Sequence, residues 1–448
     1  MAETGAEALF GLVESEVARR GGGEAELYIS RERTRRFDAR EGGIDSLSFS
    51  DSLSLGVRVF REGRMGYSYG FGASGTEVAR MVETALFSAG VSDPDEAHRL
   101  PDADGKFPAL PIYDPSWESV EDREKAEFAA RLERETLSAD PRMKRVRTAT
   151  LVESVGETSF RNSAGRSGTA RESRYAAWVD AVAEDGTEGQ TGYGHGFARR
   201  FADLRGADIS GEAARKALRM MGARRLRSGR YAAILENAAS AELLEVLAPS
   251  FLASNVAKGR SMLAQSAGKS VASPAVRISD DQLDPSGCGA GPFDAEGIPC
   301  RDNVLVEGGA LRGFLADSFW GRRLGSGTTA SSRKISPKAP PTVGISNLRF
   351  SPGRRTPAEM IREAGTGILI TEFLGIHTAD AVSGDFSVGA AGIRFEGGEE
   401  REPVRGFAVS GNVLSLLACV TEAGSDFRWF GNVGAPSLAV SGIDVGGE

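Results

Sequence analysis

The chain has 448 residues and a net charge of −8 at pH 7, from 54 Lys and Arg against 62 Asp and Glu. This mildly acidic balance argues against a broad nucleic-acid-binding face, because affinity for phosphates rests mainly on clustered Lys and Arg. Histidine and cysteine are scarce, and their spacing forms neither an H-E-x-x-H helix nor a C-x-x-C pair, which excludes a self-contained local zinc motif. The six residues are His98, His195, His377, Cys288, Cys300 and Cys419.

In the first half of the chain, the hydrophobic pattern predicts helices and strands. Apolar residues at helical spacing predict a first helix around Leu9 to Val17. Ser74 to Glu77 has the pattern of a capping box and opens a second helix. Asp185-Gly186 predicts a tight hairpin turn. The other predicted elements are strands over 26–30, 35–40, 54–60, 148–155 and 175–183, a loop over 92–115, and helices over 120–138 and 210–221.

Strands and glycine turns dominate the second half. Five arginines between Arg219 and Arg230 are interpreted as a solvated linker, because no aromatic residues are interleaved with them. A helix that begins near Ser240 has an apolar stripe, and Pro249 is expected to kink or end it. The other predicted elements are a strand over 231–235, short strands from about residue 273 onward with turns at 307–309 and 396–398, and helices over 357–364 and 413–423.

These elements predict an α+β protein of two domains. Residues 1–225 would form an N-terminal α+β layer domain, and residues 226–448 a β-rich C-terminal domain, built as a barrel or a strongly curved sheet. The 57 glycines come without a matching excess of proline, which fits many tight turns in a β-rich protein.

The sequence favours a cytoplasmic protein without a membrane partner. No stretch approaches the roughly 18 consecutive apolar residues of a membrane helix. The first residues lack the basic-then-apolar pattern of a secretory signal, and three unpatterned cysteines fit a reducing compartment. Cys288 and Cys300 are either redox partners or two unrelated residues.

The densest polar cluster lies in the segment 371–387. One histidine and three carboxylates there, His377 with Glu372, Asp380 and Asp385, would form a metal site or an acid–base pair. The alternative is a loop between two strands whose polar groups satisfy exposed backbone. No nucleophile elbow, Walker loop or complete dinucleotide fingerprint is present.

A series of short segments in the second half has a specific order. It runs GPFDAEG at 291–297, VLVEGGAL at 304–311, RRLG at 322–325, TT at 328–329, ISNL at 345–348, GILITE at 367–372, SGDFS at 383–387 and VSGNV at 409–413. This series closely resembles the TldD/PmbA family, often called modulators of DNA gyrase, and within it the PmbA (TldE) branch. The first half fits as well, with strand 54–60 before Gly63 and the turn at 162–165.

The resemblance implies a two-domain fold and a dimer that encloses a central cavity. It implies a family activity of zinc-dependent cleavage of peptides and partly unfolded proteins. In the TldD branch a helix carries H-E-x-x-x-H, and a cysteine near the C-terminus is a further zinc ligand. Two imidazoles and a thiolate would hold the ion while the glutamate activates water.

This chain departs from that pattern. The matching helix window, Leu243 to Ser250, has no histidine, and Asp426 to Gly434 has no cysteine where the thiolate is expected; Cys419 lies upstream. The resemblance therefore implies a pseudoenzyme subunit without zinc or another cofactor of its own, which is not catalytic alone.

Three functional hypotheses follow. The first is a non-catalytic partner of a zinc-bearing TldD-type chain, or a homodimer, that completes the cavity and holds an extended peptide or unfolded protein by backbone pairing. The second is an independent hydrolase with its site around His377, Asp380 and Asp385. The third is a binding protein that acts on gyrase or its antagonists without touching DNA. For the first, the candidate peptide contacts are Thr371, Glu372, Asp385 and Ser387, with satisfaction of loop and strand ends as the open alternative.

Overall fold

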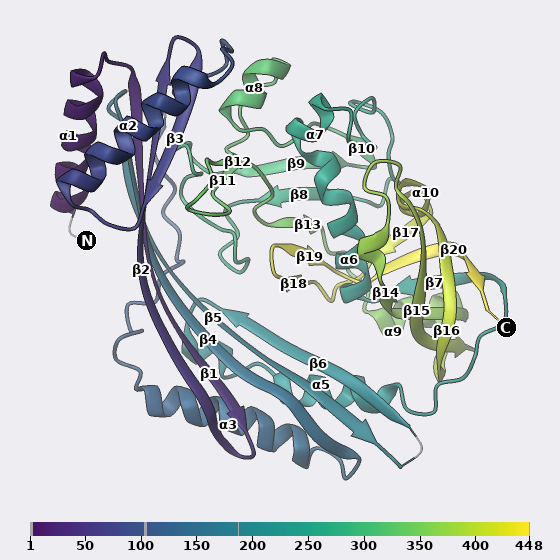
Figure 1. Cartoon of the computed structure of the whole chain (residues 1–448). Helices are drawn as coiled ribbons and strands as arrows, with labels where there is room; N and C mark the ends of the chain where they lie inside the picture. The colour runs from purple at the N-terminus through teal and green to yellow at the C-terminus, as the bar shows by residue number, and fades with distance from the viewer. Residues whose placement is uncertain (1–2, 103–104, 187, 448) are drawn as a thin grey trace.

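The computed structural model describes residues 3–102, 105–186 and 188–447. One large curled sheet and its helices form the first part of the structure, and the second part lies on the concave side of that sheet (Figure 1). Both parts mix helices and strands, so the predicted α+β class is confirmed. The division at residues 225 and 226 remains a prediction.

The curled sheet is antiparallel, with strand order β3-β2-β1-β4-β5-β6. The two predicted strands over 26–30 and 35–40 are one strand, β1, because residues Glu26 to Ala39 pair with strand β4 without a break. The predicted turn at Asp185-Gly186 lies between the paired strands β5 and β6. The strands are β1 (Glu24–Arg40), β2 (Gly43–Arg61), β3 (Arg64–Gly70), β4 (Met143–Asn162), β5 (Ser167–Glu184) and β6 (Gly189–Ala198).

Two groups of helices cover the convex face of this sheet. One group packs on the apolar residues of β1 and β2 around Leu55 and Val57, and the other on those of β4 and β5 around Leu151 and Val179. Ser74 and Glu77 form the predicted capping box, and residues 92–102 and 105–115 contain no helix or strand, as predicted. The helices are α1 (Glu3–Arg19), α2 (Gly75–Val91), α3 (Asp122–Ser138), α4 (Phe201–Leu204) and α5 (Ile209–Arg219).

The second part contains a closed barrel, which confirms the barrel-like prediction. Its five strands are adjacent in the order β16-β15-β14-β7-β20, and pairing between β16 and β20 closes the ring. A sixth strand, β17 (Val420–Ala423), pairs antiparallel with β20. The barrel strands are β7 (Gly229–Leu235), β14 (Thr366–Leu374), β15 (Asp385–Glu396), β16 (Glu399–Asn412) and β20 (Leu438–Gly446).

A second six-stranded sheet, of order β10-β9-β8-β13-β19-β18, and a two-stranded ladder of β11 and β12 accompany the barrel. These strands are β8 (Ile278–Asp281), β9 (Asp302–Glu307), β10 (Ala310–Leu311), β11 (Ser332–Arg333), β12 (Thr342–Val343), β13 (Leu348–Phe350), β18 (Arg428–Phe430) and β19 (Val433–Ala435). The helical segments are α6 (Asn237–Leu247), η1 (Ala248–Phe251), α7 (Ala253–Ala257), α8 (Ser318–Leu324), α9 (Pro357–Ala364), η2 (Ile376–Thr378) and α10 (Val413–Ala418).

Three predictions for this part have clear outcomes. The α-helix α6 ends at Leu247, and Pro249 lies in the following 3-10 turn, as expected for a residue without a backbone N–H. Helix α9 is confirmed. The predicted helix over 413–423 is wrong in its second half, because Val420 pairs with Val440 of β20 and the chain continues as strand β17.

A buried charge cluster joins the two parts. The guanidinium of Arg58 in β2 contacts the carboxylates of Glu26 in β1 and Glu296 in the second part, both at 3.0 Å. Glu296 also accepts hydrogen bonds from the backbone N–H and the hydroxyl of Ser318, both at 2.9 Å. All three charged side chains are less than 10% exposed, so the cluster is shielded from water.

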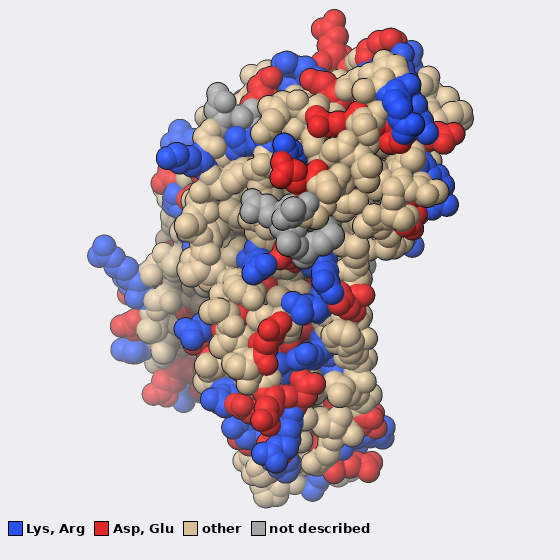
Figure 2. Space-filling view, turned by 90° about the vertical axis from the view of Figure 1, so that its left-hand side faces the viewer, with Lys and Arg blue, Asp and Glu red and all other residues tan. Residues whose placement is uncertain are grey.

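Two further features of the structure are the distribution of charged side chains on its surface and the length of its helices. On the face drawn in Figure 2, Lys and Arg side chains are interspersed with Asp and Glu. In the described part of the chain, every helix is too short or too polar to cross a membrane.

Candidate functional site

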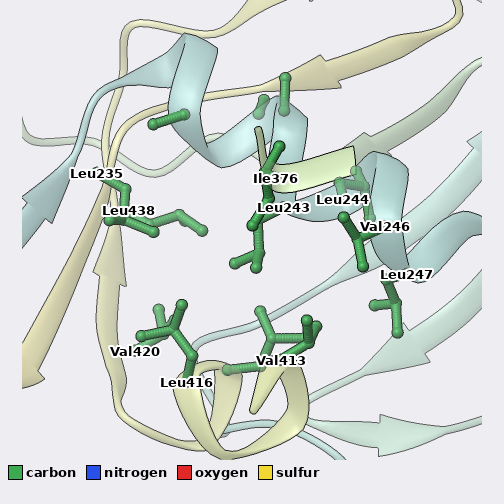
Figure 3. Packing of buried hydrophobic residues seen from close by; sticks show 14 of the residues in the cluster. Leu235, Leu243, Leu244, Val246, Leu247, Ile376, Val413, Leu416, Val420 and Leu438 are labelled. Carbon is green, nitrogen blue, oxygen red and sulfur yellow. The ribbon is translucent and has the colours of Figure 1, made fainter. Parts of the chain in front are cut away.

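Helix α6 occupies the window in which the resemblance placed a zinc helix. Its side chains Leu243 and Leu247 point into the same apolar space as Val413 and Leu416 of α10 (Figure 3). Leu243, Leu244 and Leu247 are at most 2% exposed. This face of the helix therefore serves packing, and its residue types offer no metal ligand.

Another face of α6 carries Glu242, whose carboxylate meets strand β14. A β-bulge interrupts the pairing of β14 with β15 between Ile370 and Glu372. At this bulge the backbone N–H of Phe373 donates to Glu242 Oε2 at 3.2 Å. Burial raises the pKa of Glu242 to about 7; the Phe373 hydrogen bond opposes this shift, and the charges of Glu245 and Glu372 add to it.

This raised pKa makes stability depend on pH. Glu242 binds its proton more tightly in the folded chain than in the unfolded chain, so its contribution lowers stability as pH rises from about 4.5 to about 7. We expect Glu242→Gln to be more stable than the wild type by about 1–2 kcal/mol at pH 8, after allowing for the partial exposure of the side chain. Below pH 4.5 we expect no gain in stability, because Glu242 is then protonated in both states. Urea unfolding at both pH values measures this difference. Glu399→Gln, in the exposed β15–β16 hairpin, is the control; an equal gain there would contradict the assignment.

A cleft of ≈ 720 Å³ lies beside the N-terminal end of α6, between the curled sheet and the second part. Strand β6 and helix α5 form one side of it, and β18 and the start of α6 form the other. Among its lining residues are His195, Glu212, Lys216, Glu236, Asn237, Arg428 and Trp429.

Glu212 is the charged centre of this cleft. Its carboxylate accepts from Arg428 Nη2 at 2.8 Å and pairs with Lys216 Nζ at 2.7 Å. Burial alone would raise the pKa of Glu212, but Arg428 and Lys216 outweigh it and hold this pKa below its usual value. The Glu212–Arg428 ion pair therefore links α5 of the first part to β18 of the second, while the Lys216 pair lies within α5.

His195 is part of the same link. Arg428 donates to the backbone carbonyl of His195, and Nη2 of Arg428 faces His195 Nδ1 at 3.3 Å. Because a guanidinium only donates, Nδ1 must accept, so the ring proton is on Nε2, which lies 3.3 Å from the carbonyl oxygen of Trp429. Burial and the charge of Arg428 lower the pKa of His195, so the ring is neutral at pH 7.

The four candidate peptide contacts do not converge. Glu372 lies at the bulge beside Glu242, and the Thr371 hydroxyl donates to the carbonyl of Ala391. Glu372 is opposite Ala391 in the pairing of β14 with β15, whereas Ser387 and Asp385 lie four and six residues further along β15. At about 3.3 Å per residue, these positions are roughly 13 and 20 Å away.

Two residues of the hydrolase hypothesis, His377 and Asp380, lie in the turn between β14 and β15, and Asp385 is the first residue of β15. Asp380 Oδ1 accepts from the backbone N–H groups of Val382 and Ser383, which lowers the pKa of Asp380. Asp385 Oδ1 accepts from Asn412 Nδ2 at 2.8 Å. His377 is exposed in η2. The carboxylate of Asp380 thus satisfies backbone groups of the loop, as the alternative expected, whereas that of Asp385 binds the side chain at the end of β16.

The residues present do not fit a zinc ion of the TldD kind. His98 stacks on Phe319, His195 contacts Arg428, and His377 lies in η2. Within residues 3–102, 105–186 and 188–447, no group of three or more His, Cys, Asp or Glu side chains is placed to hold a metal ion. The expected absence of a resident metal stays a prediction.

Sequence reasoning missed the His195–Glu212–Arg428 link and the pairing of Glu242 with the bulge. The sequence does contain one signal for the packing of β6 against α5, the two elements that carry His195 and Glu212. Gly192, Gly194 and Gly196 alternate in β6 under α5, and a Cβ on Gly194 would lie 2.1 Å from the carbonyl oxygen of Ile209. This alternation indicates a strand with a helix packed closely on one face and its larger side chains on the other.

Three family models match consecutive parts of the chain. They describe PmbA/TldA metallopeptidase domain 1 (residues 25–89), the central domain (115–221) and the C-terminal domain (228–447). The metalloprotease PmbA of Escherichia coli O157:H7 is 25% identical over 428 residues, which cover 95% of this chain and 92% of that protein. A metalloprotease of Methanothermobacter thermautotrophicus is 32% identical over 287 residues, 63% of each chain.

Solved structures share the fold over the full length. A Thermotoga maritima protein described as a candidate modulator of a DNA gyrase matches with a TM-score of 0.90 and 26% identity, over 99% of this chain and 100% of that one. TldE of Thermococcus kodakarensis matches with a TM-score of 0.88 at 21% identity, over 99% and 100% of the two chains, which bears on the fold alone.

Proposed function

Because the chain belongs to the PmbA/TldD metallopeptidase family, we propose that it is a non-catalytic subunit of a cytoplasmic zinc peptidase of the TldD/TldE type. It pairs with a zinc-bearing chain of the same fold and helps to hold a peptide or unfolded protein while that chain cuts it. The packing of α6 carries this proposal: the helix is present, but its leucines are buried in the core and none of its residues is a histidine.

The concave sheet supports a holding role. A substrate that passes between the two parts would meet the cleft beside α6, whose walls include Phe197, Phe427 and Trp429. Aromatic walls with a few fixed polar groups suit a mobile chain, because they bury apolar side chains without demanding one sequence. We keep four residues as proposed contacts with the peptide. They form two separate pairs, Thr371 with Glu372 on β14 and Asp385 with Ser387 on β15.

Reconstitution with a zinc-bearing TldD-type chain tests this role. We expect no cleavage of an unfolded-protein substrate by this chain alone, less than one equivalent of bound zinc per ten chains, and cleavage when both chains are mixed. Omission of either chain should abolish cleavage.

Two results would contradict the proposal. Full cleavage by the zinc-bearing chain alone would remove the need for a partner. Turnover by this chain alone, lost in His377→Ala, would instead favour the hydrolase hypothesis. A parallel assay with Arg428→Gln, which breaks the link across the cleft, reports whether cleft geometry affects cleavage by the mixture.

A further inference from the structure

A second cavity, of ≈ 190 Å³, lies between the two parts and shares no lining residue with the cleft beside α6. Strands β1, β4 and β5 of the curled sheet form one wall, and the loop 289–295 and strand β11 form the other. At roughly 30 Å³ per water molecule, the cavity has room for about six waters or for one small organic molecule. Among its lining residues are Tyr28, Thr158, Glu172, Arg174, Phe293 and Arg333.

Strand β11 brings unsatisfied hydrogen-bond donors to this cavity. Nη1 of Arg333 donates to the backbone carbonyls of Ala330 and Ser332, at 3.2 and 3.0 Å. Among the described residues, no group accepts from Nε or Nη2 of Arg333, which are buried, and the hydroxyl of Ser332, 1% exposed, also lacks a partner. Nε and Nη2 form the edge through which a guanidinium binds a carboxylate by two parallel hydrogen bonds. We call these two N–H groups the free edge of Arg333.

The carboxylates that line the cavity are engaged elsewhere. Asp294 accepts hydrogen bonds from three backbone N–H groups at 2.9 to 3.0 Å. Glu172 pairs with Arg174 at 2.7 Å and with Arg199 at 3.1 Å. Neither carboxylate therefore serves the free edge of Arg333.

A second cation without a carboxylate partner lines the same cavity. Nζ of Lys334 donates to the hydroxyl of Tyr67 at 2.6 Å and lies 5.4 Å from the ring centre of Tyr28. Burial, together with the charge of Arg58, lowers the pKa of Lys334 to about 8. The amine is therefore still mostly charged at pH 7.

The charges of the lining residues favour a monoanion. Three cations and two carboxylates line the cavity, which leaves an excess of one positive charge; they are Arg174, Arg333, Lys334, Glu172 and Asp294. Burial and the charge of Glu296 raise the pKa of Asp294, which weakens its negative charge further. A dianionic phosphate would exceed the positive charge on offer. Ile112, Pro292 and Phe293 provide an apolar part of the wall.

We propose that this cavity binds a small organic monocarboxylate, whose oxygens accept from the free edge of Arg333 and from the hydroxyl of Ser332, with its short apolar chain against Phe293. The free edge is buried, so the guanidinium turns toward the cavity to make these bonds. Because the walls come from both parts of the structure, the ligand fastens one part to the other. This site does not depend on the proposed role in proteolysis.

Calorimetric titration of the full chain with sodium butyrate at pH 7 tests the proposal. We expect saturable binding at one site, and a melting temperature that rises with butyrate concentration, because the ligand binds the folded chain. Butyramide has the same shape without the charge and should not bind. Inorganic phosphate should bind at least ten-fold more weakly than butyrate.

Two variants assign the binding to the cavity. Arg333→Lys keeps the charge but loses the paired N–H groups, and should raise the dissociation constant for butyrate at least ten-fold. Ser332→Ala removes a hydroxyl that has no partner, so it should keep the melting temperature and raise the dissociation constant several-fold. Arg312→Lys makes the first exchange at an exposed position that does not line the cavity, and should change nothing.

The proposal has clear ways to fail. No saturable binding of butyrate, equal binding of butyramide, or tighter binding of phosphate would each overturn it. So would an unchanged dissociation constant in Ser332→Ala and Arg333→Lys. If Arg333→Lys does not fold, the result with Ser332→Ala decides alone.

Discussion

Replacing Arg58 with methionine is expected to lower the free energy of unfolding by about 3–5 kcal/mol, one of the two largest effects that we predict. The substitution leaves the buried carboxylates of Glu26 and Glu296 without their cation. Burial already raises the pKa of Glu26, and Arg58 is the main group that opposes this shift. Urea unfolding at pH 7 measures the loss, and hydrogen exchange at Ser318 would report separation of the two parts.

Two further variants separate charge from packing. Arg31→Met breaks the exposed pair with Asp51 and should change stability little, because water already screens that pair. The triple variant Arg58→Met, Glu26→Gln, Glu296→Gln removes the uncompensated charges and should recover part of the loss. If the triple variant were as unstable as Arg58→Met, the loss would come from packing rather than from unpaired charge.

A second large effect is expected at Gly194 in β6. A Cβ there would lie 2.1 Å from the carbonyl oxygen of Ile209 and 2.9 Å from the backbone nitrogen of Ala213, both in α5. Because these atoms belong to the helix backbone, α5 must move away from the sheet. We expect Gly194→Ala to cost about 3 kcal/mol of stability, at the upper end for overpacking. Thermal and urea unfolding measure this.

The matched control lies in the same strand. At Gly189 the nearest atom to an added Cβ is a side-chain carbon of Glu184 at 3.6 Å, which is ordinary contact. Gly189→Ala should leave stability unchanged or slightly raised. Similar losses at both positions would mean that the strand, rather than the approach of α5, responds to the added methyl group.

Elements with local signals were predictable from the sequence. The capping box at Ser74 and the proline that opens α9 act within a few residues, and both helices are confirmed. Strand β1 was harder to predict as one continuous strand, because the mostly charged residues from Arg31 to Arg36 do not alternate with apolar ones. Its pairing with β2 and β4 on either side keeps it extended.

The site was predictable only in part. The polar turn between β14 and β15 follows from residues close in sequence, and Asp380 does satisfy that turn. Glu242 and Phe373 are 131 residues apart, and Arg428 and His195 are 233 apart. No local pattern indicates such pairs, because the bulge and the fit of the two parts create them.

The closure of the barrel sets an order for folding during synthesis. The curled sheet is complete once Ala198 has been made, so it can form early. Strand β7 is made soon afterwards, yet its neighbour β20, in which Leu438 pairs with Leu235, follows about 200 residues later. At roughly 5–20 residues per second, β7 waits for some 10–40 seconds. During that interval the edge of β7 that β20 later covers has no partner strand in this chain, and an unpaired edge of this kind exposes a folding intermediate to aggregation.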